Sequence, residues 1–282
     1  MFNKIKIQEG FLIAFFVFAL ISFLTPNLVP NNSIQTLFSV SSFLFGIFTA
    51  FSITNRHDRL NKIKEILREN DAIFLFCYQS SSIFSIKVQK EIQSLIDKNL
   101  TDQIDYYLTD FRHSNTSFIS LLTYIINLKP KTKAQEIVYG KMVDLLGDMS
   151  KNRKQVETLV QSRMPEFEWL SLIILGIIII FCIFYTNDGQ LFVATASTLL
   201  ATTVVVLLLI IRDLDTLKWK ENNWIWTQLN DLFYEINLLP YYPKNLIKSG
   251  RVKLEKNQTI RLSTCPNKYP DMTGKVVEII QI

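Results

Sequence analysis

Few residues of this 282-residue chain combine a reactive side chain with a spacing that could do chemistry. The two histidines, His57 and His113, lie in no His-Glu-x-x-His, Cys-x-x-Cys or glycine-rich phosphate-binding pattern, which are the usual signs of metal and nucleotide sites. His57 is better explained as a residue on a helix surface near lipid headgroups. We therefore expect no enzymatic activity, no bound metal ion and no cofactor.

Asp213 and Asp215 are two closely spaced carboxylates that follow a long apolar run. Carboxylate oxygens are the ligands that calcium prefers, so a cation site is one interpretation. Arg212 and Lys218 are near enough in sequence to pair with these acids. Ion pairs at the end of a helix are the favoured prediction, and calcium binding is the alternative.

A third set of residues forms a weakly polar stripe inside an apolar segment. Its members are separated by three or four positions, which places them on one face of a helix: Gln35, Ser39, Ser42, Gly46 and Thr49. Small and weakly polar residues let membrane helices approach closely, or they face water. The stripe therefore predicts either helix packing, through Ser42, Gly46 and Thr49, or the lining of a pore.

Four apolar runs must position these residues, and each is long enough to cross a bilayer. They cover residues 11–29, 33–53, 169–185 and 191–211, and none contains Asp, Glu, Lys, Arg or His. A membrane helix needs roughly 20 apolar residues, whereas a core helix of a soluble protein keeps a polar face. The first run lacks the small-residue cleavage site of a signal peptide. We therefore predict four transmembrane helices.

The positive charges lie on one side of these four runs. Of the 30 Lys and Arg residues, two precede the first run, 17 lie between Arg56 and Arg163, and 11 lie from Arg212 to Lys275. Cytoplasmic loops retain Lys and Arg, so both termini are predicted to be cytoplasmic in a multi-pass protein of a plasma (inner) membrane. This orientation, with attraction to anionic membrane lipid, explains the net charge of +5, and no nucleic-acid partner is expected.

The helical pattern of the second run continues past Arg56 without Gly or Pro, which predicts one long helix that leaves the bilayer. Further amphipathic stripes predict helices near residues 86–100, 118–128 and 134–160. The predicted fold is an all-α membrane protein with a short β or irregular C-terminal tail. Its parts are a transmembrane pair (1–54), a cytoplasmic helical domain (55–167), a second transmembrane pair (168–212) and a cytoplasmic C-terminal segment (213–282).

The segment Ser-Phe-Leu-Phe-Gly-Ile at residues 42–47, followed by Arg56, resembles the pore-helix motif of bestrophin chloride channels. The four spans and the helical insert between the second and third resemble that family too. The Arg-Asp-Leu-Asp sequence at 212–215 is similar to a bacterial and plant bestrophin-like family of unknown function. The chain is therefore identified as a bestrophin-like membrane protein.

This resemblance implies a homo-oligomer, a pentamer in bestrophins, in which the second helix lines a narrow neck. The positions that match the neck are Ser39, Phe43 and Ile47, and Phe51 continues their register. Ser39 stands where the family has a large apolar residue, and the acidic calcium-binding cluster of animal bestrophins has no match that can be placed. Beyond the neck, Arg56 and Arg59 are expected at the cytoplasmic mouth.

The favoured hypothesis is an oligomeric ion channel with an apolar neck, whose partners are ions, membrane lipid and copies of the same chain. The alternative is a membrane-anchored signalling or scaffold protein whose cytoplasmic helices bind a partner. A proton- or sodium-coupled transporter is disfavoured, because the predicted spans contain no carboxylate.

Overall fold

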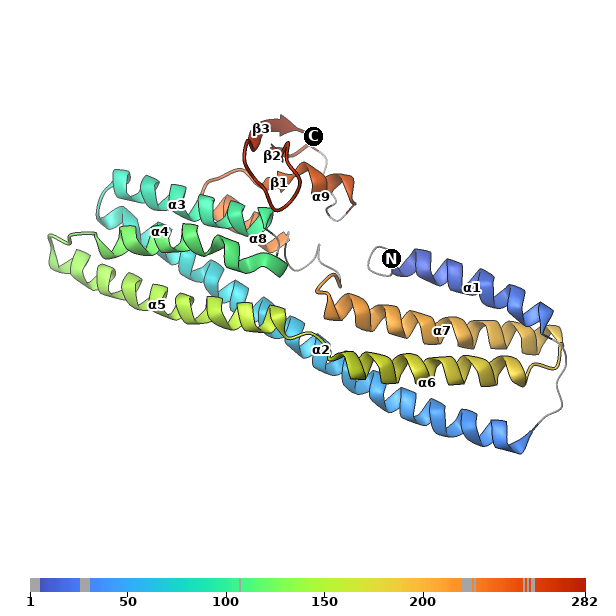
Figure 1. Cartoon of the computed structure of the whole chain (residues 1–282). Coiled ribbons are helices and arrows are strands. Elements are labelled where there is room, and N and C mark those ends of the chain that lie inside the picture. The colour runs from blue at the N-terminus through green and yellow to red at the C-terminus, as the bar shows by residue number, and fades with distance from the viewer. Residues whose placement is uncertain are drawn as a thin grey trace. The chain divides into compact units, whose positions relative to one another are not determined.

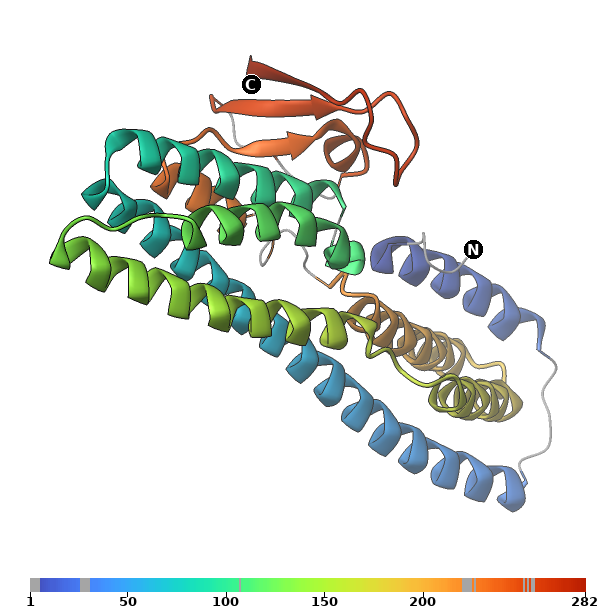
Figure 2. The same cartoon turned by 60° about the vertical axis from the view of Figure 1, so that its left-hand side comes forward.

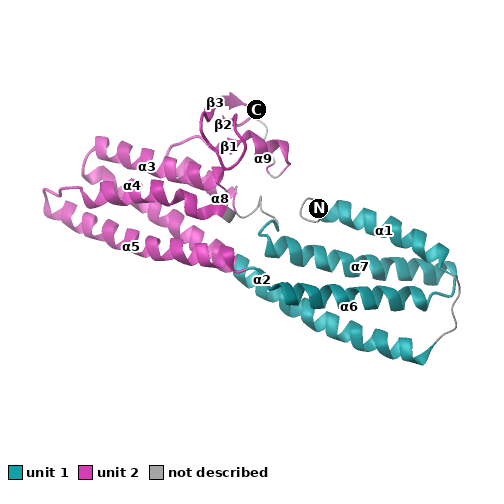
Figure 3. Ribbon diagram, viewed as in Figure 1, with its two compact units in different colours: residues 1–60, 163–219 teal, residues 61–162, 220–282 magenta. Residues whose placement is uncertain are grey.

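The computed structural model describes residues 6–25, 31–106, 108–219, 225, 227–250, 252, 254 and 257–282. Its contacts divide the chain into two compact units (Figure 3). We call Met1–Leu60 together with Arg163–Trp219 the span unit, and Asn61–Ser162 together with Lys220–Ile282 the sheet unit.

The span unit contains four helices that are long and apolar enough to cross a membrane, as the sequence predicts. They are α1 (Ile7–Leu24), the first part of α2 (Asn32–Ser80), α6 (Glu166–Tyr185) and α7 (Leu191–Asp215). Within this unit α7 lies between α1 and α6, and α6 and α7 pack beside α2 (Figure 1). Residues 26–29 of the predicted first span lie outside the described residues.

Close packing holds α2, α6 and α7 together. Phe45 of α2 is buried in a cluster with Leu172 and Ile179 of α6 and Val204 of α7. At Gly176 an added Cβ would lie 3.3 Å from Cγ1 of Val204, so a larger residue would push α6 and α7 apart. This glycine therefore serves close helix approach, a common device in membrane bundles.

Helix α2 is continuous from Asn32 to Ser80, which confirms the long helix predicted across Arg56. It begins in the span unit and ends in the sheet unit. Helix α5 ends at Gln161, and α6 begins at Glu166. Pro165 immediately precedes α6, where its fixed φ suits the start of a helix.

The sheet unit contains the second part of α2 and several shorter elements (Figure 2). Ser85 and Thr132 cap α3 and α5, their side chains accepting hydrogen bonds from Val88 N and Gln135 N. The helices are η2 (Ser81–Ile83), α3 (Ile86–Asp105), η3 (Leu108–Ser114), α4 (Asn115–Ile126), α5 (Lys133–Gln161), α8 (Thr227–Glu235) and α9 (Lys244–Lys248). The strands are β1 (Tyr241–Pro243), β2 (Thr259–Thr264) and β3 (Val276–Gln281).

The expected β character of the C-terminal tail is confirmed as a sheet of order β1-β2-β3. Strand β1 pairs with β2 in parallel, and β2 pairs with β3 antiparallel. Two polar links join this sheet to α3. Arg261 donates to both carboxylate oxygens of Asp97 at 2.7 Å, and Tyr241 Oη and Lys275 Nζ donate to Asp105. Burial raises the pKa of Asp105, and the Lys275 ammonium opposes that rise.

Candidate pore-lining face and its charged end

Within the span unit, α2 presents two different faces. Phe45 is 5% exposed because it enters the core with α6 and α7, whereas Phe43 is 68% exposed. Each residue turns a helix by 100°, so positions 43 and 45 point to nearly opposite sides. The predicted neck residues Ser39, Phe43, Ile47 and Phe51 are all exposed in a single copy of the chain.

The three predicted packing residues do not share one environment. Thr49 is 4% exposed and Ser42 is half-buried, and neither hydroxyl has a hydrogen-bond partner among the described residues. Gly46 is exposed, and no atom lies within 4 Å of a Cβ built on it. Within one copy, Thr49 and Ser42 therefore face the bundle, while close approach at Gly46 to a second copy stays a prediction.

The exposed face of α2 changes character along the helix. Gln35 and Ser39 are exposed near its start, and Phe43, Ile47 and Phe51 follow at four-residue intervals. By contrast, between residues 167 and 185 every exposed side chain of α6 is apolar, as expected of a surface that faces lipid tails. The α2 stripe thus combines polar and apolar residues, a composition that differs from that of the exposed surface of α6.

A buried charged cluster lies where α2, α7 and the chain before α6 meet in the span unit. The Asp215 carboxylate accepts a hydrogen bond from the Met164 backbone N–H at 2.8 Å, and Nη1 of Arg56 and of Arg59 lie 3.4 and 3.7 Å from Oδ1. Arg59 also donates to the Asp215 backbone carbonyl at 2.9 Å. Asp215 is 6% exposed and Arg59 is 7% exposed, so these charges neutralise one another largely out of water.

The ion-pair prediction for Asp213 is confirmed, because Nε and Nη2 of Arg212 donate to its Oδ1 at 2.8 and 2.6 Å. Asp215 instead meets arginines that precede it by 156 and 159 residues, partners that proximity in sequence could not reveal. Within the described ranges no three His, Cys, Asp or Glu residues lie close enough together to hold a metal ion. The two arginines expected at the mouth of the pore are thus anchored to the end of α7.

The family model described as the bestrophin-like domain matches residues 11–216. This range contains nearly all of α1 and the whole of α2, α6 and α7, and it includes the α2 stripe and the cluster around Asp215. Comparisons with curated proteins and with solved structures find no match to the chain. The resemblance inferred at residues 42–47 and 212–215 is therefore confirmed, and the chain belongs to the bestrophin-like family of membrane proteins.

Proposed function

We propose that this protein is an oligomeric ion channel, a pentamer by analogy with bestrophins, whose neck is lined by α2. The observation that carries the proposal is the outward stripe formed by Ser39, Phe43, Ile47 and Phe51. Along α2 the stripe begins with the polar Ser39 and continues with three apolar residues. The other helices of the same chain leave it uncovered. Membership of a family of channel-forming membrane proteins supports the same conclusion.

The stripe suits a ring of subunits. Residues four positions apart on a helix project from the same side, so each would form its own layer of identical side chains around the axis of a closed ring. In this arrangement Phe43 and Ile47 form two successive apolar layers. Narrow apolar layers exclude water, and an ion that enters must lose part of its hydration shell. These layers would therefore act as the gate.

The charged cluster predicts a weak preference for anions. Arg56 and Arg59 bring two guanidinium groups to the end of the span, and the Asp215 carboxylate partly offsets them. In a ring of subunits, arginines at this position would raise the local concentration of anions. We place this end at the cytoplasmic mouth, because the positive charge of the chain is all on this side of the predicted spans.

The orientation in the plasma (inner) membrane can be tested by cysteine labelling of intact cells. Cysteines introduced at Asn31 or Asp188 should react with an impermeant external reagent in intact cells, and one at Asn152 should not. Labelling at Asn152 in intact cells would contradict cytoplasmic termini and a cytoplasmic sheet unit.

Ion flux through reconstituted protein tests the neck. Phe43→Ala and Ile47→Ala remove apolar volume from the proposed constriction, so each should raise flux in liposomes, and the double variant should raise it further. Ile177→Ala on α6 is the matched control, since Ile177 is also an exposed apolar residue of a span. If the double variant stays an intact oligomer and its flux equals that of the control, α2 does not line the pore. The scaffold interpretation would then be preferred.

A further inference from the structure

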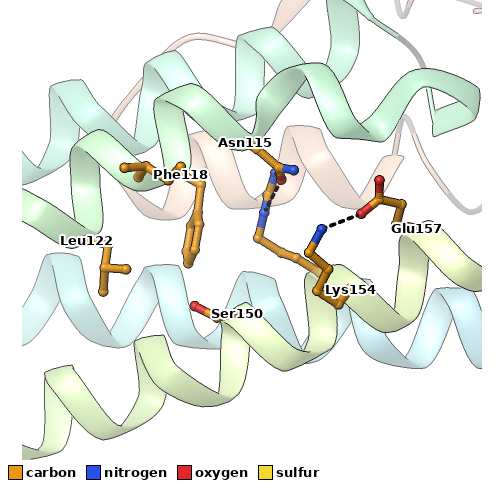
Figure 4. A pocket seen from close by; sticks show the side chains of 8 residues that line it. Asn115, Phe118, Leu122, Ser150, Lys154 and Glu157 are labelled. Atoms are coloured by element: carbon orange, nitrogen blue, oxygen red, sulfur yellow. Dashed lines mark hydrogen bonds and ion pairs between the residues drawn. The ribbon is translucent and has the colours of Figure 1, made fainter.

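A pocket of about 280 Å³ lies between α4 and α5 in the sheet unit (Figure 4). One wall is a face of α4 and the other a face of α5, because the lining residues of each helix recur at three- and four-residue intervals. The α4 wall is mostly apolar and consists of Asn115, Phe118, Ile119 and Leu122. The α5 wall is polar and charged and consists of Ser150, Arg153, Lys154 and Glu157.

The most unusual of these residues is Arg153, which is 3% exposed. Its guanidinium carbon lies 4.6 and 4.8 Å from the ring centres of Phe111 and Phe118, so the cation is within cation–π distance of both aromatic side chains. Nη2 donates to Ser114 Oγ at 2.8 Å and to Asn115 Oδ1 at 2.9 Å. Nη1 is buried and has no acceptor among the described residues.

The charge of Arg153 has no matching anion. Its hydrogen-bond acceptors are neutral, and no carboxylate of the described residues forms an ion pair with it. The Glu157 carboxylate acts on Arg153 only through a Coulomb interaction, and it accepts a hydrogen bond from Lys154 at 2.9 Å. Burial lowers the pKa of Arg153 to about 10, which still leaves it cationic at neutral pH. Buried charges are normally paired, so a counter-charge is missing here.

A purely structural role explains only part of this arrangement. Two nitrogens of Arg153 join α5 to the start of α4 through Ser114 and Asn115. That link explains neither the unused Nη1 nor the cavity that Arg153 lines beside it. An anion-binding pocket requires a fixed hydrogen-bond donor and space for the ligand. The unused Nη1 and the cavity are features of these two kinds.

We propose that this pocket binds a small organic anion, a carboxylate or phosphate group attached to an apolar moiety. The anionic oxygens accept from the ammonium of Lys154, which pairs with Glu157 in this structure, and from Nη1 of Arg153, which a shift of the buried side chain brings to the cavity. The apolar part of the ligand packs against Phe118, Ile119 and Leu122. Ligand pockets usually enclose about 300–1,000 Å³, so the volume here suits a small metabolite.

Binding to the full-length protein in nanodiscs tests this proposal, with empty nanodiscs as the blank. Isothermal titration calorimetry with 3-phenylpropionate and with phenyl phosphate shows whether the pocket prefers a carboxylate or a phosphate group. The uncharged 3-phenylpropanamide has nearly the same shape as the carboxylate, and it should bind at least ~10-fold more weakly, because it lacks the charge-assisted hydrogen bond.

Variants locate the binding. Arg153→Met should weaken the affinity for the anion at least ~10-fold, and Arg153→Lys should lose less because it keeps the charge. Ile119→Trp fills the pocket without altering a charge, and Ile137→Trp is the matched control because it lies exposed on α5 outside the pocket. The first should abolish binding and the second should not, with both proteins folded. Equal affinity for anion and amide, no binding of either anion at millimolar concentration, or unaltered binding to Ile119→Trp would overturn the proposal.

Discussion

Asp215 offers a stringent test of how the end of α7 is tied to α2. Its side chain is 7% exposed, and it faces Arg59, whose side chain is 5% exposed. Removing one partner of a buried ion pair costs about 3–5 kcal/mol, because the other charge remains without compensation. Asp215→Asn keeps the size of the side chain and an acceptor for the Met164 N–H. We therefore expect a loss at the lower end of that range, about 3 kcal/mol.

This loss can be measured as thermal unfolding in nanodiscs followed by circular dichroism. For a protein unit of about 150–250 residues, 1 kcal/mol corresponds to about 2–4 °C, so the melting temperature should fall by roughly 6–12 °C. Asp58→Asn is the matched control, because it makes the same charge change at an exposed position of α2. Its effect should stay within about 0.5 kcal/mol.

A second variant separates the charge from the packing. Arg59→Met removes the buried arginine that loses its carboxylate partner in Asp215→Asn, so the double variant should melt at a higher temperature than Asp215→Asn alone. Equal melting temperatures for Asp215→Asn and Asp58→Asn would refute the reasoning. A double variant less stable than both single variants would show that hydrophobic packing, not charge, dominates at this site.

Three further predictions concern packing and protonation. Burial, reinforced by Glu235, raises the pKa of Asp71 to about 7, so the folded protein holds a proton that the unfolded chain releases above about pH 4. Stability should therefore fall as the pH rises from about 4 to about 7, and Asp71→Asn should raise the melting temperature at pH 8 but not at pH 4. Gly176→Val should destabilise the span unit by about 1–3 kcal/mol in melting experiments, whereas Gly46→Ala, where no atom lies within 4 Å of the added Cβ, should not destabilise it by overpacking. Ile63→Pro interrupts α2 at a fully buried position and should lower stability by about 3 kcal/mol or more, and size-exclusion chromatography should then show loss of the intact particle.

Much of the fold follows from patterns that are local in the sequence. Uninterrupted apolar runs predict the helices of the span unit, and the absence of Gly and Pro in the stretch past Arg56 predicts one long helix that leaves the bilayer. The structure extends this helix to Ser80. A helical pattern gives the relative angles of residues but not which angle faces a neighbouring helix. For that reason the sequence pattern predicts one packing face for Thr49 and Gly46, although Thr49 is buried and Gly46 is exposed in the structure.

Contacts between segments that are distant in the sequence leave no local pattern from which they could be predicted. The arginine partners of Asp215 precede it by more than 150 residues and Met164 precedes it by 51, so no local spacing indicates the cluster. Arg153 lies in a polar stretch of α5, and such a stretch normally forms a solvated face. Its burial depends on contacts with Phe111 of η3 and Phe118 of α4.

The subunit number and axial pore radius of the purified particle test the central claim most directly. Single-particle imaging of the protein in nanodiscs should show a closed ring of identical subunits. We expect α2 to be the helix nearest the axis, with the narrowest point at the layers of Phe43 and Ile47. A monomeric particle, or a ring whose axis is lined by another helix of the span unit, would contradict the account.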